Sequence, residues 1–172
     1  GNTFTTVGLN LTAPGNIRIP TAGSHSGQLV LGRVTTVDGN IIVDADSVSI
    51  SRLLQAGGVG KSVSVTARSG GISFDVLGRI EQPSGPVTLS AAAGAITNTN
   101  AVRVPNHVSA PNGLSLTALS RAELRTSVDS LTAMVSGGNL VIDESGPLVL
   151  AGVTARNIRV LSQGHLSQTA PI

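Results

Sequence analysis

A short phrase recurs along the whole chain: a glycine, usually one further residue, and then an apolar, any, apolar triplet. The glycines that open it are Gly15, Gly39, Gly60, Gly85, Gly113, Gly138 and Gly164. Their spacing is regular to within a few positions from one end of the chain to the other. A regular period of this size is typical of repeat architectures, in which each unit packs only against its neighbours. The chain is therefore expected to fold as a stack of similar units.

Each unit contains two or three short stretches in which apolar and polar residues alternate. Between the glycine phrases these stretches lie at residues 29–31, 48–50, 72–74, 102–104, 148–150 and 158–160. Alternation with a period of two, together with many β-branched residues, is typical of β-strands. Turn-forming triplets such as Ser69-Gly70-Gly71 and Ser136-Gly137-Gly138 separate them. Residues 1–172 are therefore predicted to form one all-β, parallel β-solenoid segment of about six to seven coils, each about 25 residues long.

Equivalent apolar residues of successive coils are expected to stack on one another inside the solenoid. One predicted stack contains Ile17, Ile41, Val63, Val87, Leu114, Leu140 and Leu166. A second contains Ile19, Val43, Val65, Leu89, Leu116 and Ile142. The chain has no Trp or Tyr and only two Phe. A narrow tube of repeated layers has room for aliphatic side chains, whereas ordinary cores and ligand pockets depend on aromatic rings for buried area.

Residues 117–135 are compatible with two structures. An amphipathic helix would gather Leu119, Ala122 and Leu131 on one face. The rival is two strands, at residues 123–126 and 131–135. Thr126-Ser127-Val128-Asp129-Ser130 is poor helix material, which favours the strands. A β-sandwich is the alternative all-β fold for the whole chain, although sandwiches usually have longer strands.

The charge of the chain is small and scattered. Eleven Lys and Arg residues oppose nine Asp and Glu residues, for a net charge of +2. No aromatic residue lies among the arginines, which argues against a nucleic-acid-binding protein. The apolar runs are far shorter than the ~20 residues that span a bilayer. There is no cysteine for a disulfide framework. Because the chain begins at Gly1, we expect it to be a piece of a longer repeat protein or a processed chain.

One segment imitates a nucleotide-binding motif. The sequence Ala56-Gly57-Gly58-Val59-Gly60-Lys61-Ser62 looks like the phosphate-binding loop of small GTPases. Gln55, however, stands where the motif has its first glycine, and the alternating residues 63–67 follow where the motif needs a helix. We therefore expect no nucleotide here and interpret the segment as a glycine-rich turn that enters a coil.

The histidines and acidic residues form no recognisable site in the sequence. His25, His107 and His165 do not share a phase of the repeat, so exposed turn residues are expected rather than a triad or a metal site. The acidic pairs Asp44/Asp46 and Asp143/Glu144 are interpreted as turn caps. No cofactor or metal is expected. Thr-x-Thr rows, which would suggest an ice-binding face, do not recur from coil to coil.

Two longer stretches resemble a known group of proteins. Residues 84–97 (SGPVTLSAAAGAIT) and 146–155 (GPLVLAGVTA) are similar to the degenerate repeats of filamentous-haemagglutinin-type bacterial exoproteins, which include two-partner-secreted adhesins. The resemblance is one of composition and repeat phase, and it extends over essentially the whole chain. It implies a right-handed parallel β-helix, exported by an outer-membrane secretion partner that acts on another part of the parent chain. It also implies a secreted or cell-surface location and a role in cell adhesion and virulence, with host glycans or surface receptors as partners.

Two functions are therefore considered. The first is a non-catalytic structural and adhesive segment of a bacterial β-helical fibre, a monomeric rod whose coil ends tend to associate. The alternative is a β-helical carbohydrate-binding or polysaccharide-processing module that acts on an acidic polymer. Its candidate contact residues are Arg103, Arg121, Arg125, Arg156 and Arg159. Nine scattered acidic residues and the lack of Trp and Tyr argue against a sugar-cleaving groove, so no enzymatic activity is expected.

Overall fold

The computed structural model describes residues 8–20, 27–98 and 107–170. These ranges form strands, turns and irregular segments but no helix. The predicted strand at residues 102–104 lies outside them. The strands are β1 (Leu9–Ala13), β2 (Ile17–Pro20), β3 (Gln28–Thr36), β4 (Ile41–Ala45), β5 (Ser47–Ile50), β6 (Leu53–Gln55), β7 (Val63–Ala67), β8 (Ile72–Phe74), β9 (Arg79–Glu81), β10 (Val87–Ala91), β11 (Ile96–Asn98), β12 (Val108–Ala110), β13 (Leu114–Ala118), β14 (Arg121–Val128), β15 (Ser130–Glu144), β16 (Leu148–Ser162) and β17 (Leu166–Gln168).

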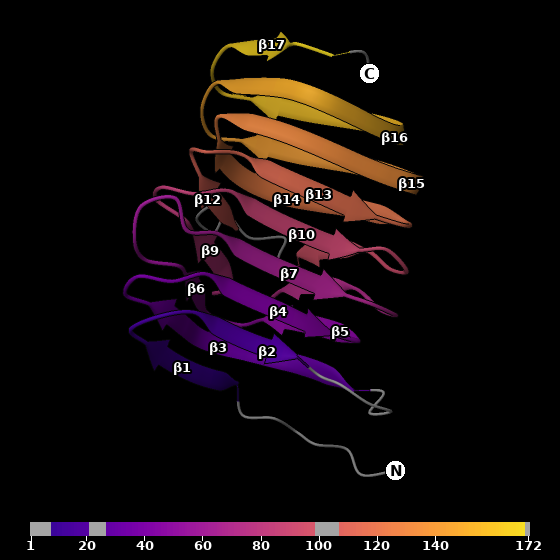
Figure 1. Ribbon diagram of the computed structural model, residues 1–172. Coiled ribbons are helices and arrows are strands. Elements are labelled where there is room, and N and C mark those ends of the chain that lie inside the picture. The colour runs from indigo at the N-terminus through magenta and orange to yellow at the C-terminus, as the bar shows by residue number, and fades with distance from the viewer. Residues whose placement is uncertain (1–7, 21–26, 99–106, 171–172) are drawn as a thin grey trace.

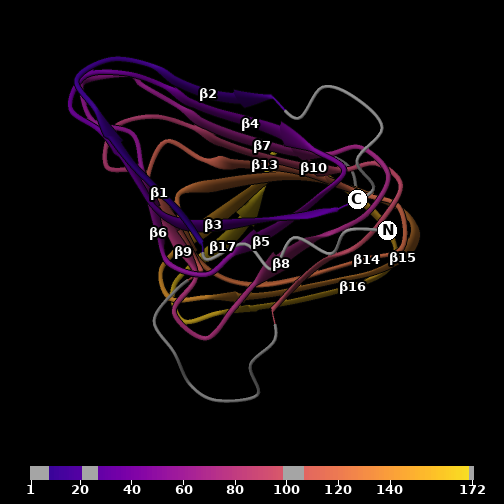
Figure 2. The same ribbon diagram turned by 90° about the horizontal axis from the view of Figure 1, so that it is seen from below.

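The strands wind around a solenoid with three faces (Figures 1 and 2). The front face contains β2, β4, β7, β10, β13 and the first parts of β15 and β16, with β17 above them. The rear face contains the start of β3, then β5, β8, β11, the start of β14 and the second parts of β15 and β16. The side face contains β1, the end of β3, then β6, β9, β12 and the end of β14.

Every strand pairs in parallel with strands of the neighbouring coils, so the predicted β-solenoid is confirmed and an antiparallel sandwich is excluded. The solenoid makes about seven turns with coils of about 20 residues; the first coils have nearly the predicted length and the later ones are shorter. In Figure 2, which looks from the N-terminal end, the chain runs along β4 and returns along β5 in a clockwise sense as it recedes from the viewer. The helix is therefore right-handed, as the resemblance implied.

The predicted interior stacks are correct through the first five strands of the front face. Residues Ile17, Ile41, Val63, Val87 and Leu114 pair in turn, and so do Ile19, Val43, Val65, Leu89 and Leu116. Nine of these ten side chains are buried and Ile19 is partly buried. Period-two alternation fixes this arrangement, because it sends alternate side chains of a strand to the interior.

After Leu116 the predicted stacks are wrong. Leu114 pairs with Leu131 instead of Leu140, and Leu140 pairs with Ala122 and Ile158 on the rear face. Ile142 likewise belongs to the rear face, and Leu166 pairs with Leu148.

The cause of this shift is a change in coil length. From Ile17 to Leu114, each step between paired front-face residues is close to the glycine spacing. The next two steps, from Leu114 to Leu131 and from Leu131 to Leu150, are markedly shorter. The later coils are shorter because β14, β15 and β16 each pass from one face to the next without leaving the strand. The glycine period therefore continues past Gly113 while the coil period does not.

Strands fill the segment at residues 117–135, as favoured over the helix. β13 ends at Ala118, β14 covers Arg121–Val128 and β15 begins at Ser130. Both later strands are longer than predicted. In β14 burial alternates over its full length, so the interior side chains Ala122, Leu124, Thr126 and Val128 hold the strand in place through the corner.

The core is almost wholly aliphatic, as the composition predicts. Its largest fully buried side chain is Phe74 of β8. The ring of Phe74 contacts the ring of His107, with centroids 5.6 Å apart and planes tilted by 52°. This pair supplies bulk across the two coils that precede the shortening.

Candidate functional site

The front face presents two columns of small hydroxyl side chains. The first column contains Ser64, Thr88, Ser115 and Thr132, which pair in register from β7 to β15. The second contains Thr66, Ser90 and Thr117, followed by Met134 and Thr154. Neighbouring strands lie ~4.8 Å apart, so each column repeats its hydroxyl at about that spacing.

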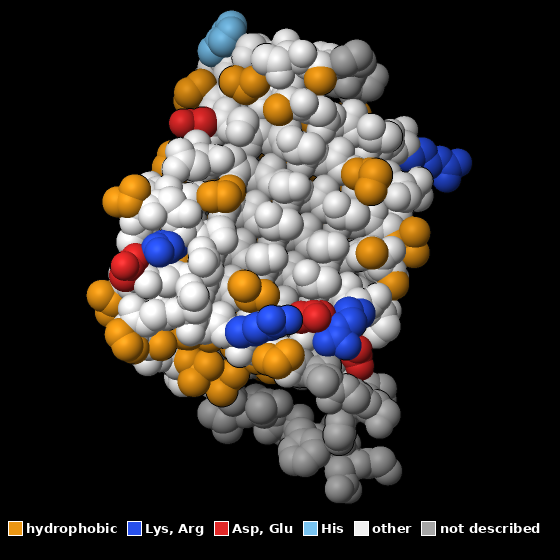
Figure 3. All heavy atoms as spheres, viewed as in Figure 1, with side chains coloured by type: hydrophobic (Ala, Val, Ile, Leu, Met, Phe, Trp, Pro, Cys, Tyr) orange, Lys and Arg blue, Asp and Glu red, His pale blue; other side chains and the backbone are white. Residues whose placement is uncertain are grey.

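Among the described residues, no charged side chain lies in the middle of this face. Figure 3 shows white, neutral polar side chains there, with charged side chains only toward its margins and its N-terminal end. Rows of Thr-x-Thr do not recur, as expected, but rows that mix Ser and Thr do. Treating the two hydroxyl residues as equivalent at the outward positions of the glycine phrase would have revealed this face in the sequence.

The structure brings only some of the candidate arginines close to one another. Arg103 lies outside the described residues. Arg121 and Arg125 are on β14, and Arg156 and Arg159 are on β16. The registers of β14, β15 and β16 bring three of them to the rear face: Arg121 aligns with Asn139 and Asn157, Arg125 with Asp143 and Leu161, and Arg159 with Val141 and Glu123.

Two of these arginines are neutralised by ion pairs. Arg121 hydrogen-bonds the carboxylate of Glu123, and the Arg125 Nε lies 3.4 Å from the Asp143 Oδ2. Among the described residues, neither Arg156 nor Arg159 forms an ion pair. Exposed ion pairs of this kind contribute only about 0–1 kcal/mol to stability.

The segment that imitates a phosphate-binding loop is a turn. Gly58 and Gly60 adopt left-handed backbone conformations with φ of 89° and 70°. The chain then enters β7 at Val63, so a strand stands where the nucleotide motif requires the N-terminus of a helix. The Lys61 Nζ lies 3.3 Å from the Asp38 Oδ1 of the preceding coil.

Of the four acidic residues interpreted as turn caps, Asp44 and Asp143 lie within β4 and β15 and form ion pairs, so that interpretation is wrong for these two. Asp44 accepts a 2.6 Å hydrogen bond from the Arg68 Nε of the next coil, and Asp143 pairs with Arg125. Glu144 is buried, and its carboxylate caps the turn as interpreted from the sequence. Its Oε2 accepts hydrogen bonds from the Thr126 hydroxyl at 2.7 Å and the Val128 N–H at 3.1 Å, and its Oε1 accepts one from the Gly146 N–H at 2.9 Å.

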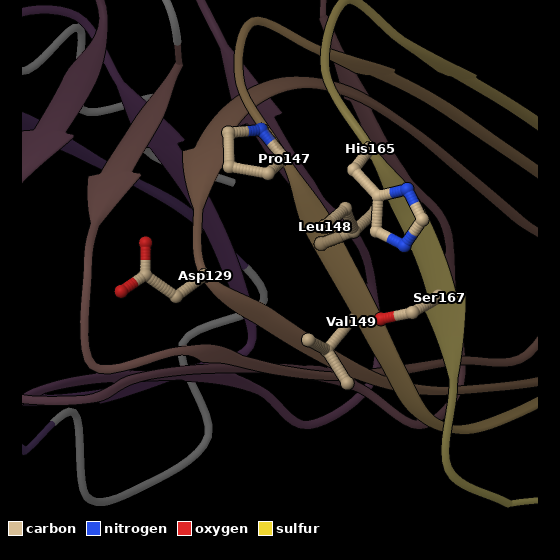
Figure 4. Close-up of a pocket in the computed structure, with 6 residues that line it drawn as sticks. All are labelled: Asp129, Pro147, Leu148, Val149, His165 and Ser167. Atoms are coloured by element: carbon tan, nitrogen blue, oxygen red, sulfur yellow. The ribbon is translucent and has the colours of Figure 1, made fainter.

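A shallow, half-open pocket of about 190 Å³ lies near the C-terminal end of the front face. Asp129, His165 and Ser167 line it together with Pro147, Leu148 and Val149 (Figure 4). The first three are the residue types of a hydrolase triad. Figure 4 shows the Asp129 carboxylate well apart from the His165 ring, and within the described part of the chain no hydrogen bond joins any two of the three side chains. A catalytic triad depends on hydrogen bonds between its three side chains. The volume of this pocket is also smaller than the ~300–1,000 Å³ that is usual for a ligand site.

The histidines differ in their environments. His25 lies outside the described residues, and His165 is exposed as predicted. The prediction of an exposed residue is wrong for His107, which is 2% exposed. Its Nδ1 accepts a hydrogen bond of 3.0 Å from the Arg125 backbone N–H. Burial lowers the pKa of His107 below its ordinary value of 6.5; the charge of Arg125 lowers it further and that of Glu123 opposes the shift.

Comparisons with known proteins do not assign the chain to a family. No family model matches it, and neither the curated proteins nor the solved structures contain a match. Within residues 8–20, 27–98 and 107–170, no group of three or more His, Asp or Glu residues is arranged to hold a metal ion. The same ranges contain no helix long and apolar enough to cross a membrane.

Proposed function

We propose that the chain is a non-catalytic structural and adhesive segment of a secreted or surface-displayed bacterial fibre. The observation that carries the proposal is the front face, where strands from β7 to β15 stay in register and present uncharged hydroxyl columns. A stack of hydrogen-bonded coils resists bending because each coil pairs with both of its neighbours. A rod of this kind spaces other parts of a fibre and offers one continuous face for attachment.

The expected partners are host glycans or surface receptors. Hydroxyl side chains both donate and accept hydrogen bonds, so they suit partners that are rich in hydroxyl and amide groups. The face has little charge to exclude a neutral partner. Individually weak contacts become useful when several coils engage the same surface, because the second contact is then effectively intramolecular.

The resemblance to filamentous-haemagglutinin repeats supports the proposed location and export. Its two stretches, residues 84–97 and 146–155, each cover a front-face strand and the corner beside it. The repeated phrase is thus the part of a coil that builds the front face. Export would depend on a secretion partner that recognises another part of the parent chain.

Binding of the purified chain to immobilised glycans and to host cells tests this function. The double variant Thr88→Lys with Ser115→Lys places two charges in the centre of the front face. We expect it to lower binding by about tenfold or more, because a charge buried against a neutral partner loses its hydration. Ser127→Lys, on the side face, is the matched control and should bind as the unmodified chain does. Equal binding by all three proteins would show that the front face is not the adhesive surface.

The second candidate is a carbohydrate-binding or polysaccharide-processing module for an acidic polymer. Arg156 and Arg159, which lack carboxylate partners among the described residues, are the feature in its favour. Salt-dependent retention on a heparin column separates the two functions. The adhesive function predicts that Arg156→Ala with Arg159→Ala elutes no earlier than Arg18→Ala with Arg33→Ala, which removes the same charge elsewhere. Selective loss of retention in the first pair would favour the polymer-binding module.

A further inference from the structure

His107 is held between two coils at the point where the solenoid narrows. It directly precedes β12, on the side face. Its backbone N–H donates to the Arg125 carbonyl at 2.9 Å, and its carbonyl accepts from the Ile80 N–H at 2.7 Å. The residue therefore bridges β9 below and β14 above. The length of the coils also changes here: the front-face step from Leu114 to Leu131 contains fewer residues than the preceding step from Val87 to Leu114.

The surroundings of the ring accept only the neutral form of histidine. Because Nδ1 accepts the hydrogen bond from the Arg125 N–H, the proton of the neutral ring is on Nε2. Nε2 is buried and has no hydrogen-bond partner in the described part of the chain. The Phe74 ring packs beside it and brings no charge.

Protonation would disrupt this arrangement directly. A proton on Nδ1 would face the Arg125 N–H, so an acceptor would become a second donor. The charged groups on the neighbouring strands offer little compensation. On β14, Arg125 opposes a positive ring and Glu123 hydrogen-bonds Arg121; on β15, Asp143 pairs with Arg125. On β9, Arg79 and Glu81 pair with each other at 2.6 Å.

We propose that His107 is an acid-sensitive latch: the neutral ring holds β12 between β9 and β14, and protonation releases this part of the coil. The latch is independent of what the front face binds. Above the ordinary histidine pKa of 6.5 it is fully closed. As the pH falls through 6.5 toward the lower pKa of the folded form, the unfolded or opened form binds the additional proton and becomes favoured.

Urea unfolding of the complete chain, followed by circular dichroism between pH 7.5 and pH 5.5, tests the latch. For one proton, the ratio of folded to unfolded chain should fall by up to about tenfold per pH unit below the ordinary histidine pKa. Carboxylates ordinarily titrate at about pH 4, below this window. His107→Gln can still accept from the Arg125 N–H but does not titrate, so its stability should be constant across the window. His25→Gln and His165→Gln should each retain the slope of the unmodified chain.

Amide hydrogen exchange places the effect and does not depend on the variants folding. In the unmodified chain, protection of the Arg125 amide should fall on acidification from pH 7.5 to 5.5, after correction for intrinsic exchange, whereas protection of the Val65 amide on the distant β7 should not. Unchanged protection of the Arg125 amide would overturn the latch. A folded His107→Gln variant that keeps the pH slope of the unmodified chain would also overturn it.

Discussion

Single buried polar side chains close the corner between the side face and the front face. Thr36 donates to the Gly39 carbonyl and accepts from the Gly57 N–H. Two coils later, Gln82 accepts from the Ala56 N–H and donates to the Lys61 carbonyl. At a later corner the Glu144 carboxylate only accepts, from the Val128 and Gly146 N–H groups. The turn leaves backbone groups without strand partners, and each of these side chains supplies the missing hydrogen bonds.

Replacement of Glu144 tests this role at the level of one residue. Glu144→Ala leaves the Val128 and Gly146 N–H groups and the Thr126 hydroxyl without their partner. Because hydrogen bonds to a charged group contribute about 1.5–3 kcal/mol each, we expect the free energy of unfolding, measured in urea, to fall by about 3 kcal/mol. Glu123→Ala, which removes an exposed ion pair, should cost less than about 1 kcal/mol. Equal small losses in both variants would contradict the capping role.

The strands of the front face show how much of the fold the sequence could predict. From Ile17 to Leu116 the alternation and the glycine spacing both match the structure, because each coil uses one phrase and one turn in the same place. At Leu140 the same phrase builds a rear-face strand. Local pattern identifies a strand but not the face to which it belongs, since the face depends on how many residues the preceding corner uses.

The candidate site was predictable to a similar extent. The hydroxyl columns follow from outward positions such as Ser64 and Thr88 once the register is known. The partner of Arg125 could not be predicted, because Asp143 comes beside Arg125 only through the shortened coil. The burial of His107 was missed because its inward position depends on the packing of β12 between two other coils.

Gly138 lies in β15, where this strand passes from the front face to the rear face close to the preceding coil. A Cβ at this position would overlap the Ser120 carbonyl of the preceding coil, whereas a Cβ at Gly15 would meet no atom within 4 Å. Both glycines open the same sequence phrase. We expect Gly138→Ala to lower the free energy of unfolding by about 1–3 kcal/mol, as overpacking does. Gly15→Ala should leave it nearly unchanged. Thermal unfolding of the two variants that gave the reverse order would contradict the packing.

Strand edges at the ends of the stack are expected to determine whether molecules of the chain associate with one another. β17 pairs with β16 on one side only within the described residues, and Leu161 and Leu166 are 49% and 44% exposed near this end. Unpaired strand edges with apolar neighbours promote association. Sedimentation velocity at rising concentration should show end-to-end association that Leu161→Lys with Leu166→Lys reduces. Val59→Lys, at a highly exposed corner, should not reduce it. Association that persists unchanged in the double variant would locate the contact elsewhere.

The front face remains continuous because the coil shortens after Leu116. Disulfide cross-linking tests it directly, since the chain has no cysteine of its own. Thr117 and Met134 are paired on adjacent front-face strands, at a separation of ~4.8 Å that a disulfide can bridge. We predict rapid oxidation of Thr117→Cys with Met134→Cys to an intramolecular disulfide, and none for Thr117→Cys with Asp143→Cys, the pair that an unchanged coil length would bring together. Cross-linking of the second pair in place of the first would contradict the account.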